Sequence, residues 1–380
     1  MNIGIVCYPT FGGSGVLATE LGKALADKGH VIHFITYQQP VRLSDSFHPN
    51  IFYHEVSVPT YPLFDFPPYE SALSSTMVDV TINQNLDLLH VHYAIPHASA
   101  AYMARQILRT KGIEIPFITT LHGTDITLVG RDKTYEPVVT FSMNESNAIT
   151  AVSQNLKAET LAYFNVTQDI EVITNFVDIK RFQLSNKDHF KKMLAPNGEK
   201  ILTHVSNFRK VKRVDDVIHI FKNVRKLTPC KLLMIGDGPE RQHAEQLCRD
   251  LGTCDDIRFL GKQEKLEEIL SITDVFLLPS EYESFGLAAL EAMACQVPVV
   301  SSNGGGLAEI NEHGITGYLA NVGDVDAMAK YVMDIISDEE TLYKFKANAL
   351  AHAKKYDIDN IIPLYEKLYE KVVKKSNEYV

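Results

Sequence analysis

Short apolar runs, each followed by a turn and a helical segment, recur along the whole chain and restrict its fold more than any other feature. The first run, 2–7, precedes the glycine-rich turn 8–15 and the helical segment 16–29. The same unit begins again with the run 201–205, which leads into the turn 206–213. Strands that alternate with helices in this way form parallel sheets covered by helices. The sequence therefore predicts an α/β protein with two Rossmann-like domains that face each other.

The length of the chain, 380 residues, is sufficient for two domains. The stretch 174–178 separates the two series of strands and is interpreted as a hinge. We therefore expect an N-terminal domain over residues 1–172 and a C-terminal domain over residues 173–359. The charged tail has a helical pattern, and we expect about residues 360–380 to pack back on the first domain.

Composition excludes several functional classes. A formal net charge of −10 argues against a nucleic-acid partner, and no apolar run approaches the roughly 20 residues of a membrane span. The N-terminus has no basic region and no signal-peptide cleavage site. Five cysteines without a C-x-x-C pair indicate neither a disulfide framework nor a zinc site. We expect a cytoplasmic protein with reduced thiols.

The stretch 279–298 is the strongest functional signal. It follows a buried-strand run, has Ser284 at a predicted N-cap position, and continues as a predicted helix over 285–295. The first amides of a helix lack intrahelical partners and favour a phosphate, which Gly286 would let approach closely. The predicted phosphate-facing groups are the backbone amides of Phe285, Gly286 and Leu287.

Two carboxylates, Glu283 and Glu291, flank this helix start. Because anions repel a phosphate but accept hydrogen bonds from sugar hydroxyls, they favour a sugar nucleotide as ligand. The alternative is an ordinary helix, with one acid favoured by the helix dipole and one in solvent.

A basic cluster follows the strand 201–205. Arg209, Lys210, Lys212 and Arg213 are four bases within five positions of an acidic protein. Arg suits bidentate contact with phosphate and Lys supplies a point charge, so the cluster favours a diphosphate clamp over a solvated helix start. The end of the strand 257–261 could present its backbone to a base edge.

The glycine turn 12–15 formally satisfies a dinucleotide fingerprint, with Ala18 in the last position. The second strand, 31–36, is followed by Tyr-Gln-Gln instead of the acid that would bind an NAD ribose. An NAD oxidoreductase is therefore disfavoured. Polar side chains also follow strands of the first half, at Tyr93, His97 and His122, where open α/β sheets bind ligands. Structural histidines, and a turn that Asp125 caps, are the alternatives there.

With these motifs in view, the chain resembles the retaining glycosyltransferases of the GT-B fold, in the group with glycogen and sucrose synthases. The resemblance is carried by Glu283-x7-Glu291, the glycine loop 12–13, and the bases Arg209 and Lys212. It implies that Glu291 binds the donor ribose, Glu283 the hydroxyls of the transferred sugar, and the two bases the diphosphate. It implies no metal and no cofactor.

The runs 7–15, 90–97, 119–125 and 206–209 resemble a narrower branch of this family. That branch transfers N-acetylglucosamine from UDP-GlcNAc to the hydroxyl of L-malate, with retention, as the first step of bacillithiol biosynthesis. The implied partners are these two small molecules, with no nucleic acid and no membrane. The oligomeric state stays open, a homo-oligomer included. The predicted site residues are His122, Arg209, Lys212 and Glu283 for catalysis, Gly13, Ser14, Arg209, Lys212, Leu260, Glu283, Ser284, Phe285, Gly286, Leu287 and Glu291 for the donor, and Ser14, Tyr93 and Thr120 for the acceptor.

Three alternatives share the double-Rossmann plan. One is a GT-B glycosyltransferase that uses another UDP- or GDP-sugar with a different acceptor. Another is a non-catalytic protein that binds a nucleotide sugar. The third is a nucleotide-sugar epimerase or phosphorylase. A phosphorylase would need a cofactor lysine or a phosphate acceptor site, and the sequence displays neither.

Overall fold

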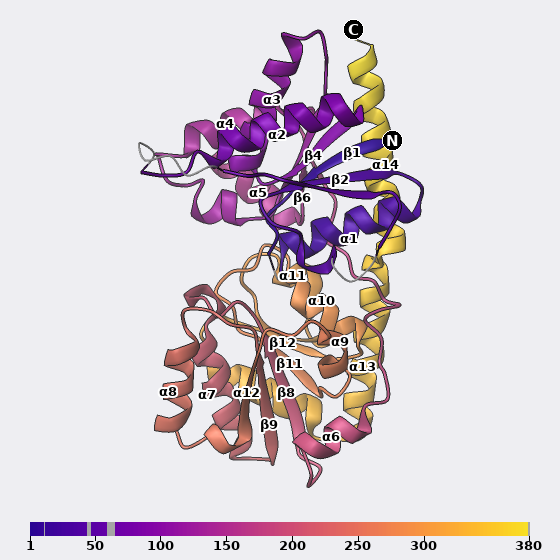
Figure 1. The fold of residues 1–380 in the computed structure, drawn as a ribbon. Coiled ribbons are helices and arrows are strands. Elements are labelled where there is room, and N and C mark those ends of the chain that lie inside the picture. Colours follow the sequence, from indigo (N-terminus) through magenta and orange to yellow (C-terminus); the bar gives the residue numbers. More distant parts are fainter. Residues whose placement is uncertain (11, 44–46, 59–64, 379–380) are drawn as a thin grey trace. The chain divides into compact units, whose positions relative to one another are not determined.

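The computed structural model describes residues 1–10, 12–43, 47–58 and 65–378 (Figure 1). The chain divides into two compact units. Unit 1 comprises residues 1–175 and 359–380, and unit 2 comprises residues 176–358. The division thus falls after residue 175, compared with the predicted 172. None of the described helices is long and apolar enough to cross a membrane.

Unit 1 is built on a parallel sheet of seven strands in the order β3-β2-β1-β4-β5-β6-β7. Every residue of the central strands β4 and β5 is buried, as expected for parallel strands covered on both faces. The strands are β1 (Asn2–Val6), β2 (Val31–Thr36), β3 (Ile51–Glu55), β4 (Leu88–His92), β5 (Phe117–Leu121), β6 (Ala148–Ala151) and β7 (Ile170–Val172).

The helices of unit 1 pack closely on this sheet. On the first helix, a Cβ added at Gly22 would lie 2.4 Å from the ring of Phe34 on β2, so glycine permits the close approach of helix and sheet. On the last helix, the ring of Tyr369 is fully buried in the same unit. The helices are α1 (Ser14–Asp27), α2 (Tyr69–Gln84), α3 (Ser99–Arg109), α4 (Glu136–Glu145), α5 (Gln154–Tyr163) and α14 (Ile358–Asn377, yellow in Figure 1).

Unit 2 repeats the plan with six parallel strands in the order β10-β9-β8-β11-β12-β13. In both units the order reverses beside the first strand, which is the Rossmann arrangement that the sequence predicts. The strands are β8 (Lys200–Val205), β9 (Cys230–Ile235), β10 (Ile257–Gly261), β11 (Val275–Leu278), β12 (Val299–Ser302) and β13 (Gly317–Ala320).

The core of unit 2 joins its sheet to helices on one face, through buried side chains such as Phe221, Leu232 and Val332. These apolar groups leave water on folding, which is the main stabilising contribution. The helices are α6 (Asp188–Leu194), α7 (Val214–Arg225), α8 (Arg241–Asp250), α9 (Leu266–Leu270), α10 (Leu287–Ala294), α11 (Leu307–Ile310), α12 (Val325–Ile336) and α13 (Glu339–Ala353). Short 3-10 turns lie at Val41–Leu43, Lys210–Lys212, Cys254–Asp256 and Lys354–Tyr356.

Two predictions are corrected. The helix expected to begin at Phe285 with Ser284 as its cap begins at Leu287, because Gly286 has φ 100° and occupies the cap position itself. All cysteines were expected to be reduced thiols, but Cys248 and Cys254 form a disulfide. Beyond α8 the chain turns back at Gly252, which brings the two Cα atoms to 5.0 Å.

Candidate donor and acceptor sites

Three of the predicted donor residues, Arg209, Lys212 and Glu283, lie in loops at the carboxyl ends of β8 and β11, where the sheet order of unit 2 reverses. Ligands of open α/β sheets bind at such points. The loop after β8 and the loop after β11 are joined there, because the amide of Glu281 donates to the carbonyl of Val211 at 2.8 Å. Basic and acidic side chains of the two loops are therefore neighbours.

Lys212 and Glu283 form the central contact of this edge. The Lys212 Nζ lies 2.6 Å from Oε1 of Glu283, and the hydroxyl of Ser280 donates to the same oxygen at 2.8 Å. The two charged side chains are 19% and 13% exposed, so the pair is sheltered but accessible. A donor with hydroxyl and diphosphate groups could contact both at once.

Three consecutive glycines after β12 hold the loop that carries Glu283. A Cβ added at Gly304 would lie 2.2 Å from the carbonyl oxygen of Glu281, and one at Gly305 would lie 2.2 Å from that of Glu283. The amide of Gly306 also donates to the carbonyl of Glu283 at 2.7 Å. These glycines are missing from the predicted site, although their run directly after a strand was a signal for close backbone packing.

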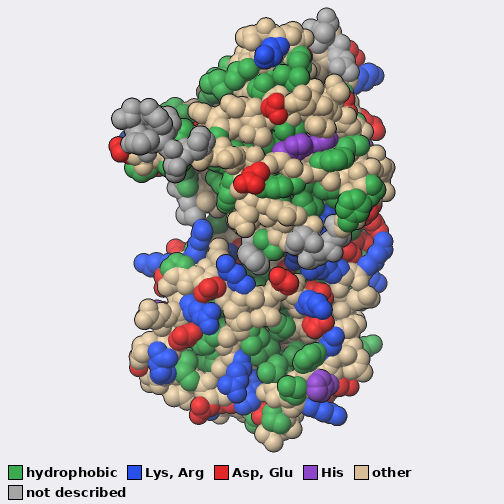
Figure 2. Space-filling view, in the orientation of Figure 1, with side chains coloured by type: hydrophobic (Ala, Val, Ile, Leu, Met, Phe, Trp, Pro, Cys, Tyr) green, Lys and Arg blue, Asp and Glu red, His purple; other side chains and the backbone are tan. Residues whose placement is uncertain are grey.

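Arg209 lies at the exposed start of the Lys210–Lys212 turn. Its guanidinium forms no ion pair with any residue that the structure describes, so it is available to a ligand. On the face seen in Figure 2, basic and acidic side chains of unit 2 are interspersed. That mixture suits a small charged ligand better than a nucleic acid.

Other residues predicted for the donor belong to unit 2, whereas Gly13 and Ser14 belong to unit 1. Glu291 is buried on α10, and Leu260 is half-buried in β10. The Phe285 side chain is 1% exposed and packs on the ring of Tyr356, so only its backbone could face a ligand. Leu287 is the first residue of α10, directly after Gly286.

In unit 1, Ser14 and Tyr93 are brought together. Their hydroxyl oxygens are 2.6 Å apart, where Gly13 (φ 61°) precedes the start of α1. The ring of Tyr93 also contacts that of His122, with centroids 5.2 Å apart. Two of the three residues predicted for the acceptor, Ser14 and Tyr93, therefore form one cluster with His122, which was predicted for catalysis.

His122 is held as a neutral imidazole. Its Nε2 lies 2.8 Å from Nδ1 of His92, and burial lowers the pKa of His122 to about 3. Burial also lowers the pKa of His92 well below its ordinary value. A neutral ring can hydrogen-bond a substrate hydroxyl without bringing a charge into the site.

Asp125 fixes the geometry of this cluster. Its carboxylate accepts the amide of Ala94 at 2.8 Å and that of Gly123 at 3.2 Å, which ties the turn after β4 to the turn after β5. Burial raises the pKa of Asp125 to about 6, against the lowering effect of these amides. The sequence predicted Asp125 only as the cap of its own turn, whereas in the structure it also binds the amide of Ala94 in the turn after β4.

Thr120 is placed differently from its prediction as an acceptor residue. Its side chain is 1% exposed, and its hydroxyl lies 2.7 Å from Nε2 of His90 and 2.7 Å from the hydroxyl of Thr150. Because the hydroxyl is engaged inside the sheet, the geometry does not support contact with a substrate.

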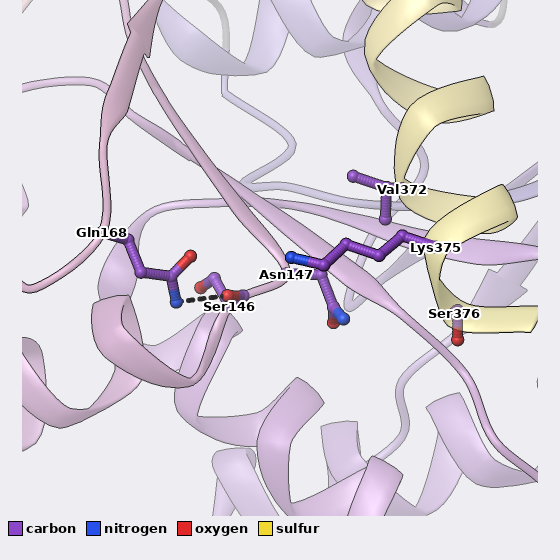
Figure 3. Close-up of a pocket in the computed structure, with 6 residues that line it drawn as sticks. All are labelled: Ser146, Asn147, Gln168, Val372, Lys375 and Ser376. Atoms are coloured by element: carbon purple, nitrogen blue, oxygen red, sulfur yellow. Dashed lines mark hydrogen bonds between the residues drawn. The ribbon is translucent and has the colours of Figure 1, made fainter. Parts of the chain in front are cut away.

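A pocket of about 320 Å³ lies elsewhere in unit 1 (Figure 3). It is lined by Gln168, which donates to the carbonyl of Ser146 at 2.7 Å, and by Lys375 of α14. Ser146 and Gln168 precede β6 and β7, so this pocket opens at the amino ends of the strands, away from the predicted site. Among the described residues, no group of His, Cys, Asp and Glu side chains is arranged to hold a metal ion.

Two protein-family models match the chain in succession. "Glycosyltransferase Family 4" matches residues 11–181, and "Glycosyl transferases group 1" matches residues 185–352. Together with the two parallel-sheet units, these matches define the class. The chain belongs to the GT-B glycosyltransferases.

Within that class, the chain is 44% identical over 376 residues to N-acetyl-alpha-D-glucosaminyl L-malate synthase of Bacillus anthracis, covering 98% of each chain. An uncharacterized glycosyltransferase of Methanocaldococcus jannaschii is 28% identical, with 92% of each chain covered. Among solved structures, sucrose-phosphate synthase of Thermosynechococcus elongatus has a TM-score of 0.83 at 20% identity, covering 99% of this chain and 100% of that one. Anabaena HepE in complex with UDP-glucose also gives 0.83, at 21% identity, covering 98% and 100%. At these identities, the two similarities show that this chain has the same fold as those proteins.

Proposed function

We propose that the protein is a retaining glycosyltransferase that moves N-acetylglucosamine from UDP-GlcNAc to the hydroxyl of L-malate, the first step of bacillithiol biosynthesis. The reaction class is carried by one observation, the placement of Arg209, Lys212 and Glu283 at one strand edge of unit 2. The particular donor and acceptor rest on the name of the full-length relative that is 44% identical.

In this proposal Arg209 and Lys212 bind the diphosphate. As the bond between sugar and phosphate breaks, negative charge grows on UDP, and fixed cations that face this charge lower the barrier. Glu283 accepts hydrogen bonds from the transferred sugar, and Glu291 from the ribose. The acceptor hydroxyl attacks from the face of the leaving group, whose phosphate takes its proton. No protein nucleophile is needed in that mechanism.

The acceptor is proposed to bind unit 1 near Ser14, Tyr93 and His122. Hydroxyl groups can donate to the malate carboxylates, while the neutral imidazole of His122 contacts the malate hydroxyl. This assignment rests on the clustering of the three side chains. Cytoplasmic location and independence of metals and cofactors are part of the same proposal. A disulfide is unusual in the cytoplasm, so thiol titration of freshly isolated protein tests the location.

The decisive experiment incubates the protein with UDP-GlcNAc, with and without L-malate, and measures UDP release. Malate-dependent release, with an α-linked product by NMR, is expected, and the Lys212→Ala variant serves as the inactive control. Release only with another acceptor would favour another branch of the family. Binding of UDP without any release would favour a nucleotide-sugar sensor. Turnover after treatment with EDTA tests independence of metals.

A further inference from the structure

His204, the fifth residue of β8, is fully buried near the carboxyl end of that strand. The loop 206–209, which ends in Arg209, follows directly after the strand. Its two ring nitrogens have different partners. Nδ1 lies 2.9 Å from the carbonyl oxygen of Leu277 on β11, and Nε2 lies 2.8 Å from the hydroxyl of Ser206. None of the roles proposed above uses this histidine.

The direction of each hydrogen bond follows from the chemistry of the partners. A carbonyl oxygen only accepts, so Nδ1 of His204 carries the proton and donates to Leu277. In a neutral ring Nε2 is then an acceptor, so the hydroxyl of Ser206 donates to it. The Ser206 oxygen in turn accepts the amide of Phe208 at 3.2 Å. The chain of bonds thus runs from β11 through β8 into the backbone of the loop.

The loop that receives this chain is held tightly. A Cβ added at Gly236 would lie 1.7 Å from the carbonyl oxygen of Ser206, and one at Gly238 would lie 2.0 Å from that of Asn207. Phe208 is fully buried in a left-handed conformation, with φ 38°. Such a conformation costs a non-glycine residue free energy, so it persists only where surrounding contacts hold it.

The residue that follows this strained position is Arg209. Its side chain is exposed, while the backbone before it is fixed by the Ser206 hydroxyl and by the amide of Glu240, which donates to the carbonyl of Phe208 at 2.9 Å. The direction in which Arg209 leaves the loop therefore depends on the conformation at Phe208.

We propose that His204 is a positioning residue of the donor site, which through Ser206 holds Phe208 in its left-handed conformation and so aims Arg209 at the diphosphate leaving group. The inference rests on the proposed function, since it assigns the ligand of Arg209. A misplacement of about 1 Å can cost 10²-fold in rate, because the interaction with the growing charge depends on distance.

The test compares the turnover number and the KM for UDP-GlcNAc in a series of variants. His204→Phe keeps a ring but removes both hydrogen bonds, and should lower kcat roughly 10- to 100-fold with little change in KM. His204→Gln, which can still donate to a carbonyl and accept from a hydroxyl, should retain more activity. Thr203→Val is the matched control. It removes the 2.7 Å contact with Thr273 from the neighbouring buried position of β8, on the opposite face, and should leave kcat unchanged.

A double variant shows whether His204 acts through Arg209. Once Arg209→Ala has removed the guanidinium, adding His204→Phe should lower kcat no further. Losses that multiply in the double variant, or a His204→Phe protein with wild-type kcat, would overturn the inference. If His204→Phe does not fold, Ser206→Ala takes its place, because it removes the hydroxyl that joins His204 to the amide of Phe208. The same loss of kcat is then expected, and the same results would overturn the inference. Wild-type protein without malate-dependent turnover would contradict the proposed function itself, and the inference with it.

Discussion

Lys212 and Glu283 form an ion pair of 2.6 Å although they are 71 positions apart in the chain. One follows β8 and the other follows β11, and these strands are neighbours in the sheet of unit 2. The sheet therefore brings a cation and an anion to one edge without any local sequence contact. Each charge keeps the other in place, and each is sheltered enough to act strongly on a bound donor.

Replacing Lys212 by Ala should lower kcat about 10²- to 10³-fold, because a fixed donor facing the leaving group is lost. It also leaves the Glu283 carboxylate without its cation beside an anionic ligand, so UDP should bind more weakly. Steady-state kinetics and calorimetric titration with UDP measure both effects. Lys210→Ala, an exposed neighbour in the same turn, is the control. Similar losses in both variants would show that only the net charge matters.

Gly305 should tolerate no side chain. It has φ +66°, and an added Cβ would lie 2.2 Å from the carbonyl oxygen of Glu283. Gly252 has the same φ, +66°, with nothing within 4 Å. Gly252→Ala should therefore cost about 1 kcal/mol for its backbone alone. Gly305→Ala should cost clearly more and also impair turnover. Urea unfolding of both variants measures the difference, and equal losses would reject the role of the close contact.

Much of the fold could be predicted because its signals are local. Apolar runs and glycine turns mark the strands and their carboxyl ends, and the structure has Arg209, Glu283 and Tyr93 in loops that follow β8, β11 and β4, as predicted. The beginning of α10 could not be located as well. A left-handed conformation at Gly286 moves the helix start, and it depends on the close packing of this glycine against Leu307.

The direction in which individual side chains point could not be predicted from the sequence either. Thr120 was predicted to face a substrate, but it lies between His92 of β4 and Thr150 of β6 in the sheet and bonds inside it. Similarly, the Cys248–Cys254 disulfide depends on how the chain turns after α8. Such contacts are set by tertiary packing and carry no periodic signal.

Tyr93→Phe should raise the KM for L-malate about 10-fold with a smaller effect on kcat. The substitution keeps the ring that contacts His122 but removes the hydroxyl that lies 2.6 Å from Ser14. A hydrogen bond to a charged group contributes about 1.5–3 kcal/mol, which is sufficient for such a change. Tyr102→Phe on α3 is the control. An unchanged KM for malate would remove Tyr93 from the acceptor site.

Unit 1 should lose stability as the pH falls below about 6.5, because five of its histidines resist protonation. Burial lowers the pKa of His90 and of His122 to about 3 and that of His97 and of His33 to about 4. It also lowers the pKa of His92 well below its ordinary value. Below pH 6.5 the unfolded chain binds these protons first, so stability falls as pH falls. Asp125 acts oppositely. Its pKa is raised to about 6, so its contribution is present at low pH and lost as pH rises through 6.

Five histidines outweigh one carboxyl group, so the net loss should be roughly 4 kcal/mol per pH unit between pH 6 and 4. Urea unfolding at several pH values measures this slope. His90→Gln should reduce the slope of the unfolding free energy against pH by the contribution of one proton, about 1.4 kcal/mol per pH unit, since one buried imidazole is removed. His189→Gln, at an exposed position of unit 2, should leave it unchanged. A stability that is flat with pH in the wild type would mean that the imidazoles of unit 1 are solvated, which would also remove the basis for a neutral His122.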